Sequence, residues 1–409
     1  MPKNHIITGL DIGTGSIKIL VANLESGEEK LEVLSLVREN SFGVRRGVVV
    51  NVEGVSNILQ NSLSRIKEDV GFKINSAYVN VDGSHLFSLP SRGTIAVSRA
   101  DQKISEEDIN RVLQAAQTIS LPSNKEIFDV FPREFIIDGQ KGIKEVLGLQ
   151  GVRLEAEVLV LGGFAPYLKN LSRAVTDSEL QILDIVPSPI AAARAVLTPR
   201  QKEIGVALLD IGAGTTGLAV FEEGDLIHFT VLPIGSMNIT HDIAIGLKLD
   251  VDVAERIKIE YGSCLLKGEK KTRLRGKEKI EIEGEAPLVF SRKALNEIIE
   301  IRTSEIFSEV QKELKKISRE KLLPAGIVLT GGGAKLPGIV ELAKRELKLP
   351  CKIGRPQGFQ DLEEDLSFST VCGLVLAGVD LIEESQPVIS EFGKGISSKI
   401  KRVFKIFLP

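Results

Sequence analysis

The chain has 409 residues, and at roughly 150 residues per domain this length predicts more than one domain. Hydrophobic residues make up 43% and charged residues 26% of the sequence, proportions that argue against wholesale disorder and against a membrane-embedded body. The net charge of −3 is too balanced for a general nucleic-acid-binding protein, so we expect no nucleic-acid partner.

Strand-like and helix-like segments alternate from the N-terminus, a pattern typical of layered α/β folds. Apolar runs at 6–13 and 74–83 predict strands, and the amphipathic segment 52–71 between them predicts a helix. Farther along, Ser105 is a credible helix N-cap followed by acidic residues. We expect that helix to belong to a small α/β insertion at about 85–163.

Two later segments differ in composition from the rest of the chain. Residues 267–285 are dense in Lys, Arg, Glu and Gly around a short alternating run, which predicts an exposed hairpin. Residues 383–395 contain Pro, Ser and Gly, which disfavour regular secondary structure, so we predict a linker there. The three cysteines lie far apart in the sequence without CxxC spacing, so we expect neither a disulfide framework nor a zinc site. This cysteine usage is consistent with a protein of the reducing cytosol.

The most informative feature is an internal echo between residues 6–16 and 206–216. In both segments an apolar strand ends in an aspartate, Asp11 or Asp210, and is followed by Ile-Gly-x-Gly and a hydroxyl residue. A second strand-like run follows each motif, so each motif predicts a β-hairpin. Glycines at such a turn let backbone N–H groups approach a ligand closely, and concave sets of N–H groups bind phosphates.

These paired motifs predict a nucleotide held between two similar halves, with one hairpin from each half gripping the phosphates. Two ordinary hairpin turns are the alternative, which the recurrence of the motif disfavours. The two aspartates would face each other, and carboxylates there suit Mg²⁺ that keeps most of its waters. The candidate residues are Asp11, Gly13, Thr14, Gly15, Ser16 and Lys18 in the first motif, and Asp210, Gly212, Gly214, Thr215 and Thr216 in the second.

Two other phosphate-binding folds fit the sequence less well. Lys18 stands where G-x-G-x-x-G has its third glycine, and the chain returns as a strand, which disfavours a Rossmann site. No G-x-x-x-x-G-K-[ST] motif occurs anywhere, so a Walker A loop is excluded.

A third glycine-rich element follows an apolar strand at 326–339 and leads into a helix expected near Pro337. Because glycine has no side chain, a flat ring can lie against the backbone here. The candidates for binding a nucleotide are Gly331, Gly332, Gly333 and Lys335. The alternative is a tight strand-to-helix connection with no ligand. Glu255 and Lys258 lie three residues apart on one helix face, where they could reach a ribose and a base edge or form a surface ion pair.

These motifs together resemble the actin/Hsp70/sugar-kinase superfamily. DIGTGSIK, DIGAGTT and VLTGGGAKLPGI look like its phosphate-1, phosphate-2 and adenosine motifs, and IVPSPIAAARAVL and STVCGLVLAG look like its two connecting helices. Within the superfamily, GVRRGVVVNVEGVSNIL, VNVDGSHL, residues 131–161 and the tail resemble the bacterial cell-division FtsA family. The likeness runs over nearly the whole chain.

The resemblance implies an actin-like ATPase fold of two lobes, each with a ribonuclease H-like core. It implies subdomain 1A at 1–84, 164–200 and 363–385, subdomain 1C at 85–163, subdomain 2A at 201–230 and 306–362, subdomain 2B at 231–305, a linker at 386–394 and a terminal helix at 395–409.

The resemblance also implies function. ATP with Mg²⁺ would bind in the central cleft, and the chain would polymerise into actin-like protofilaments, bind the C-terminal tail of the tubulin-like protein FtsZ through subdomain 2B, and meet other division proteins. The carried-over FtsZ contact lies on the helix near 291–307, with Lys293 and Arg302 as candidates, although both could be ordinary solvated residues.

One departure from the superfamily pattern bears on catalysis. Hydrolytic members carry a Glu before the Pro of the first connecting segment, where this chain has Ser188 before Pro189. A hydroxyl is a poor group for ordering an attacking water. We therefore expect at most a weak ATPase, with Asp210 the remaining residue to order that water.

The C-terminal segment 393–409 is cationic and contains no acid. Its apolar residues recur at helical spacing, which predicts a short amphipathic helix that lies on an anionic membrane surface, with docking on the protein's own surface as the alternative. The chain would then be a peripheral protein on the cytoplasmic face of the cell membrane, at the division septum. The candidate membrane residues are Ile396, Lys399, Ile400, Arg402, Val403, Phe404, Lys405 and Phe407.

Two other functions share these motifs. A PilM-like ATP-binding adaptor of type IV pilus assembly is the nearest alternative, and the basic tail argues against it. A sugar kinase or chaperone ATPase is the other, and Ser188 argues against it.

Overall fold

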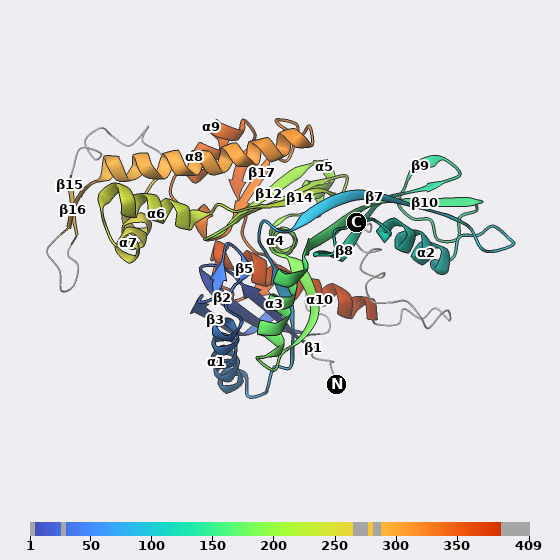
Figure 1. Ribbon diagram of the computed structural model, residues 1–409, viewed down its shortest axis with the longest axis horizontal. Helices are drawn as coiled ribbons and strands as arrows, with labels where there is room; N and C mark the ends of the chain where they lie inside the picture. Colours follow the sequence, from blue (N-terminus) through green and yellow to red (C-terminus); the bar gives the residue numbers. More distant parts are fainter. Residues whose placement is uncertain (1–4, 26–29, 265–276, 281–287, 386–409) are drawn as a thin grey trace.

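The computed structural model describes residues 5–25, 30–264, 277–280 and 288–385. The three larger of the five sheets in these residues organise the fold, two of them in lobes joined by a pair of helices and the third in an insertion (Figure 1). The region of α6, α7 and α8 and the insertion lie at opposite ends of the long axis in this view.

Lobe I is built on a six-stranded sheet of order β11-β6-β1-β2-β3-β19. Strands β1, β2 and β3 are antiparallel neighbours, whereas β6 runs parallel to β1 and β11 parallel to β6. Helix α10 packs on β1, β2 and β6, and α1 and α3 pack on each other and on β3 and β11. The elements are β1 (His5–Ile12), β2 (Ser16–Leu24), β3 (Leu31–Asn40), β4 (Val44–Arg45), β5 (Val48–Val49), α1 (Val52–Val70), β6 (Ser76–Val81), α3 (Ala165–Thr176), β11 (Gln181–Pro187), α4 (Ser188–Val196), β19 (Phe359–Gln360), η2 (Leu366–Phe368) and α10 (Ser369–Ser385).

Lobe II repeats that plan with a five-stranded sheet of order β14-β13-β12-β17-β18. Here too an antiparallel hairpin is followed by parallel neighbours, so the echo in the sequence reflects two lobes of the same design. The elements are α5 (Pro199–Ile204), β12 (Val206–Ile211), β13 (Thr216–Glu222), β14 (Asp225–Leu232), α6 (Ser236–Leu247), α7 (Val251–Tyr261), β15 (Lys277–Ile280), β16 (Leu288–Ser291), α8 (Arg292–Lys316), β17 (Ile327–Thr330), η1 (Gly332–Lys335), α9 (Ile339–Leu347) and β18 (Cys351–Ile353).

The insertion forms the third sheet, of order β7-β10-β8-β9, with its own apolar core against α2. As predicted, Ser105 caps α2: its hydroxyl accepts from the Asp108 N–H, and the Asp108 carboxylate accepts from the Ser105 N–H in return. The elements are β7 (Phe87–Ala96), α2 (Glu106–Gln117), β8 (Lys125–Ile137), β9 (Gln140–Ile143) and β10 (Arg153–Phe164).

Helices α4 and α10 join the lobes and cross in direct backbone contact. A Cβ atom added to Gly373 of α10 would lie 1.7 Å from the carbonyl oxygen of Ala191 in α4. Only glycine permits this approach. Helix α4 also packs on β12 and β13 of lobe II, and Thr370 of α10 reaches Asp210 there.

The segments after α7 differ in part from the predicted ones. The hairpin predicted at 267–285 falls mostly outside the described residues, and the part that is described, β15, pairs with β16. The second strand of this hairpin, β16, begins at Leu288, beyond the predicted end at 285. Its apolar Leu-Val-Phe run is typical of a strand. Helix α10 continues to Ser385, and the predicted linker 386–394 and terminal helix 395–409 lie outside the described residues. Within the described part of the chain, no helix has both the length and the apolar character needed to cross a bilayer.

The insertion interrupts the sequence of lobe I between β6 and α3. It also packs on lobe II, where β7 and β8 contact the edge strand β14. Ser88 donates to the carbonyl oxygen of Phe229 at 3.2 Å, and the Lys144 ammonium donates to the buried carboxylate of Asp225 and, at 2.8 Å, to the Arg133 carbonyl. Burial raises the pKa of Asp225 to about 6, against the opposing effect of Lys144.

We expect Lys144→Met to lower the melting temperature more at pH 8 than at pH 5. The folded pKa of Asp225 lies above its ordinary value of 3.8, so at pH 5 the folded state can take up a proton and avoid an unpartnered charge. At pH 8 the carboxylate stays ionised, and breaking a buried pair costs on the order of 3 kcal/mol. Thermal melts of the variant and of Lys144→Met/Asp225→Asn, which should recover most of the loss, test this; an equal loss at both pH values would contradict it.

Candidate nucleotide-binding site

The two glycine motifs are β-hairpin turns, as predicted, and they touch each other. The first turn joins β1 to β2 and the second joins β12 to β13, with the Gly13 N–H donating to the Ser16 carbonyl at 3.2 Å and the Gly212 N–H donating to the Thr215 carbonyl at 2.9 Å. A Cβ atom added to Gly214 would lie 2.8 Å from the Thr14 hydroxyl oxygen. The fold thus brings residues about 200 positions apart into contact.

Lys18 neutralises the first aspartate. It lies directly opposite Asp11 in the hairpin register, and its ammonium donates to the Asp11 carboxylate at 2.7 Å. Both side chains are buried, with exposed fractions of 8% and 7%. The lysine that breaks the G-x-G-x-x-G pattern therefore serves as the counter-ion of the predicted metal-binding carboxylate.

Asp210 is the corresponding aspartate of lobe II and is half-buried. The hydroxyl of Thr370 in α10 donates to its carboxylate at 3.1 Å. Burial, followed by the charges of Asp82 and Asp11, raises the pKa of Asp210 to about 7. A cation would favour the ionised form of this carboxylate, so binding of a cation and loss of a proton are linked here.

Asp82 is a third carboxylate that the motif analysis missed. Its carboxylate accepts from the Thr215 hydroxyl of the second turn at 2.6 Å. Burial raises its pKa, with the Thr215 hydrogen bond opposing and the charge of Asp11 adding to the rise. The available signal was the sequence VNVDG, an apolar strand that ends in Asp-Gly like the two motifs; because β6 runs parallel beside β1, their ends meet at one edge of the sheet.

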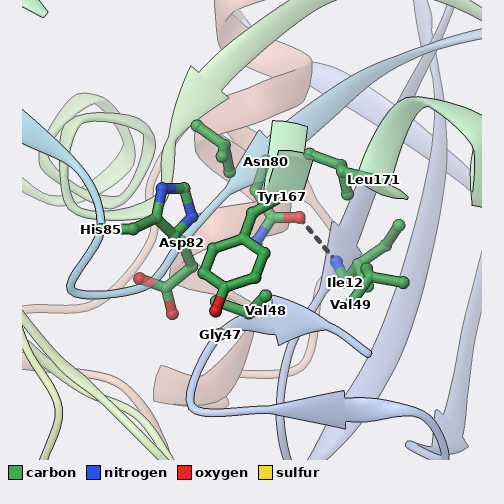
Figure 2. Close-up of a pocket in the computed structure, with 10 residues that line it drawn as sticks. Ile12, Gly47, Val48, Val49, Asn80, Asp82, His85, Tyr167 and Leu171 are labelled. Carbon is green, nitrogen blue, oxygen red and sulfur yellow. Dashed lines mark hydrogen bonds between the residues drawn. The ribbon is translucent and has the colours of Figure 1, made fainter. Parts of the chain in front are cut away.

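Asn80 ties this strand to the first turn and to Ser188. Its side-chain oxygen accepts from the Ile12 N–H at 2.6 Å, the bond drawn in Figure 2, and its amide donates to the Ser188 hydroxyl at 3.0 Å. The Ser188 hydroxyl in turn donates to the Val81 carbonyl at 3.4 Å. Ser188 is therefore committed to bonds within lobe I.

Asn80 and Asp82 also line a small pocket beside the first turn, together with His85 and Tyr167 (Figure 2). The His85 ring lies edge-on to the Tyr167 ring, with centroids 5.1 Å apart. Its Nδ1 accepts from the Phe164 N–H at 3.2 Å, and burial lowers its pKa.

The third glycine element packs behind the second turn. A Cβ atom on Gly331 would lie 2.3 Å from an Asp210 carboxylate oxygen, and one on Gly333 would lie 2.4 Å from the Ile211 side chain. The chain then forms the 3-10 turn η1, so the α-helix begins at Ile339, after the expected Pro337, because Gly338 adopts a left-handed conformation between them. Lys335 donates to Asp365 at 2.5 Å.

Glu255 and Lys258 form an ion pair of 2.6 Å on α7. The Lys258 ammonium also donates to the Ser236 carbonyl at 3.3 Å, and the Ser236 N–H donates to the Gly212 carbonyl at 2.9 Å. The pair is thereby linked to the second turn through α6.

The FtsZ candidates lie on α8, in the α6–α8 region. Arg302 donates to Asp242 at 3.0 Å and also pairs with Glu305, whereas Lys293 is exposed and reaches Glu297 at 3.6 Å. The candidate membrane residues lie outside the described residues.

The carboxylates of Asp11, Asp82 and Asp210 offer the hard oxygen donors that Mg²⁺ prefers, so the residues present fit this cation. Among the residues that the structure describes, no three His, Cys, Asp or Glu side chains converge closely enough to hold an ion directly. A cation held through its waters is the arrangement predicted from the sequence.

Comparison with known proteins decides the family. The family "Cell division protein FtsA" matches residues 207–373, and "SHS2 domain inserted in FTSA" matches residues 83–161, the insertion. The FtsA of Pseudomonas aeruginosa is 38% identical over 384 residues, covering 92% of this chain and 90% of that protein. The chain belongs to the FtsA family of cell division proteins. The FtsA of Borreliella burgdorferi is 35% identical over 410 residues, 99% of this chain and 97% of the relative.

Solved structures confirm the actin-like fold of this FtsA-family chain. A PilM–PilN type IV pilus biogenesis complex has a TM-score of 0.65 at 18% identity, covering 91% of this chain and 98% of the other. MreB5 of Spiroplasma citri bound to ADP has a TM-score of 0.54 at 15% identity, covering 93% and 99%. At these identities the likeness shows the fold alone, so the PilM alternative is a structural neighbour and the FtsA assignment stands on the sequence relatives.

Proposed function

We propose that this division protein binds ATP with Mg²⁺ between its two hairpin turns and hydrolyses it weakly at most. The contact between the turns carries this proposal, because it brings two glycine-rich turns from opposite lobes to one point. A solved MreB5 of the same fold is described as bound to ADP.

The chain's own residues have distinct roles in this site. The N–H groups of the turns would donate to phosphate oxygens, and Lys18 pairs with Asp11 at 2.7 Å. Asp11 and Asp210 would hold the waters of the cation, which when bound offsets the phosphate charge. Since Ser188 is hydrogen-bonded within lobe I, Asp210 is the candidate for ordering an attacking water.

We further propose that the chain polymerises into actin-like filaments and anchors FtsZ filaments to the cytoplasmic face of the membrane, at the septum. The family supports a role in division, and the subdomain boundaries given above remain part of this proposal. Lys293 is the more accessible FtsZ candidate, because an acidic peptide would have to compete with Asp242 for Arg302.

The segment 395–409 would be the membrane attachment. Its apolar stripe contributes roughly 1–2 kcal/mol per side chain, and ordering the helix opposes binding at about 1–2 kcal/mol per residue. One helix therefore binds marginally, whereas a filament carries many, so polymerisation and attachment reinforce each other. If a polymerisation-defective variant pelleted with anionic vesicles as well as the parent chain, this coupling would be wrong.

We expect the intact chain to co-sediment with anionic vesicles and a chain ending at Gly393 to stay in the supernatant, with ATP increasing the pelleted fraction of the intact chain. Two substitutions that make the same charge change supply the control. Ile400→Asp interrupts the apolar stripe and should abolish pelleting, whereas Ser398→Asp should retain most of it. Equal pelleting of the truncated chain would remove this segment from the mechanism.

A further inference from the structure

Asp82 joins the two lobes at the point where the hairpin turns meet. It follows β6 of lobe I, and its carboxylate accepts from the hydroxyl of Thr215 in lobe II at 2.6 Å. Thr215 is one of the candidate phosphate-binding residues, so a phosphate oxygen that takes the Thr215 hydroxyl must displace Asp82 from it.

The turn between β4 and β5 lies close against Asp82. Gly47 in that turn adopts a left-handed conformation with φ of 77°, and a Cβ atom there would lie 2.8 Å from an Asp82 carboxylate oxygen and 2.7 Å from the Gly83 nitrogen. The Gly47 N–H also donates to the Thr14 hydroxyl at 2.8 Å. Asp82 is therefore flanked by Thr215 of the second hairpin turn and by Gly47, which is hydrogen-bonded to Thr14 of the first.

The charges around Asp82 are not balanced. Burial and then the charge of Asp11 raise the pKa of Asp82, and burial followed by the charges of Asp82 and Asp11 raises the pKa of Asp210. Within the described part of the chain, the ion pair of this cluster joins Lys18 to Asp11. When all are ionised, the three carboxylates and the single ammonium leave an excess of two negative charges. A triphosphate brings further negative charge to the same place, and like charges at short range repel strongly where water is scarce.

We propose that Asp82 is a positioning residue that makes triphosphate binding conditional on its divalent cation. Asp82 accepts the hydrogen bond of the Thr215 hydroxyl, and its charge repels a triphosphate that carries no cation. A cation that enters with the phosphates offsets both effects. This role differs from that of Asp210, which holds the cation's waters. The inference rests on the proposed nucleotide site.

The test measures the affinity of the full chain for a non-hydrolysable ATP analogue by calorimetry, in MgCl₂ and in EDTA. We expect the parent chain to bind at least ~10-fold more weakly in EDTA, since the cation offsets charge in a partly desolvated site. Asparagine keeps an oxygen that accepts from Thr215 but carries no charge. In Asp82→Asn the ratio between the two buffers should shrink to about threefold, mainly because binding in EDTA tightens.

The outcomes separate this role from others. Asp138→Asn, an exposed carboxylate of the insertion that accepts from backbone N–H groups, should leave the ratio unchanged. An unchanged ratio in Asp82→Asn would show that Asp82 is only a structural hydrogen-bond acceptor. Loss of binding in both buffers, with the circular dichroism spectrum retained, would make Asp82 an essential ligand and overturn the proposal. Failure of the parent chain to bind in either buffer would refute the nucleotide site itself.

Discussion

Replacing Asp210 with asparagine should stabilise the chain without nucleotide at pH 8 and weaken its binding of Mg²⁺–ATP. The folded pKa of Asp210 is about 7, above its ordinary value of 3.8. Between these values the folded state holds a proton that the unfolded state has released, so this group's contribution to stability falls as the pH rises through that window. At pH 8 the ionised carboxylate costs on the order of a few kcal/mol, and asparagine removes that cost.

The two effects of Asp210→Asn have opposite signs, which makes the test selective. Melting temperature should rise by several degrees at pH 8, at about 2–4 °C per kcal/mol for domains of 150–250 residues. The gain should shrink as the pH falls and vanish only near the ordinary pKa of 3.8, where the folded and unfolded states both hold the proton. Affinity for Mg²⁺–ATP should fall by roughly tenfold or more, because a carboxylate that suits the cation is lost. Unchanged nucleotide affinity would remove Asp210 from the site.

The second large effect concerns the crossing of the two connecting helices. Gly373→Ala places a methyl group where the Ala191 carbonyl oxygen already lies 1.7 Å from the ideal Cβ position, and backbone atoms on both sides leave little room to adjust. We expect the free energy of unfolding to fall by about 3 kcal/mol or more, since overpacking of a well-filled core typically costs 1–3 kcal/mol even where side chains can shift.

Gly332→Ala is the matched control for stability. A Cβ atom there meets nothing nearer than 3.9 Å, and its backbone is not left-handed. Differential scanning calorimetry of both variants should show a large loss of melting temperature for Gly373→Ala alone. Similar melting temperatures for the two variants would mean that the two helices can separate without cost.

The sequence predicted those parts of the molecule that short-range patterns encode. The hairpin turns after Asp11 and Asp210, helix α1 and the cap of α2 at Ser105 each depend on neighbours within a few positions. The echo of the two motifs predicted the two-lobed design, because equivalent turns in equivalent lobes carry equivalent residues.

Other features depend on pairings between distant elements and could not be read from local patterns. Asp82 joins the site only because β6 runs parallel to β1, and the insertion docks on β14 through Lys144 and Asp225, which are 81 positions apart. The resemblance made Arg302 a candidate for binding FtsZ, but in the structure Arg302 donates to Asp242 of α6. In each case the partner is set by tertiary structure, and the sequence near the residue does not indicate it.

A structure of the full chain with Mg²⁺ and a non-hydrolysable ATP analogue would test the central claim most directly. We predict that the two hairpin turns part and that the phosphates lie between them, accepting hydrogen bonds from N–H groups of residues 14–15 and 213–214, with the cation on the side of Asp11 and Asp210. An analogue bound elsewhere, or one held by a single turn with the other turn away from the phosphates, would contradict the account.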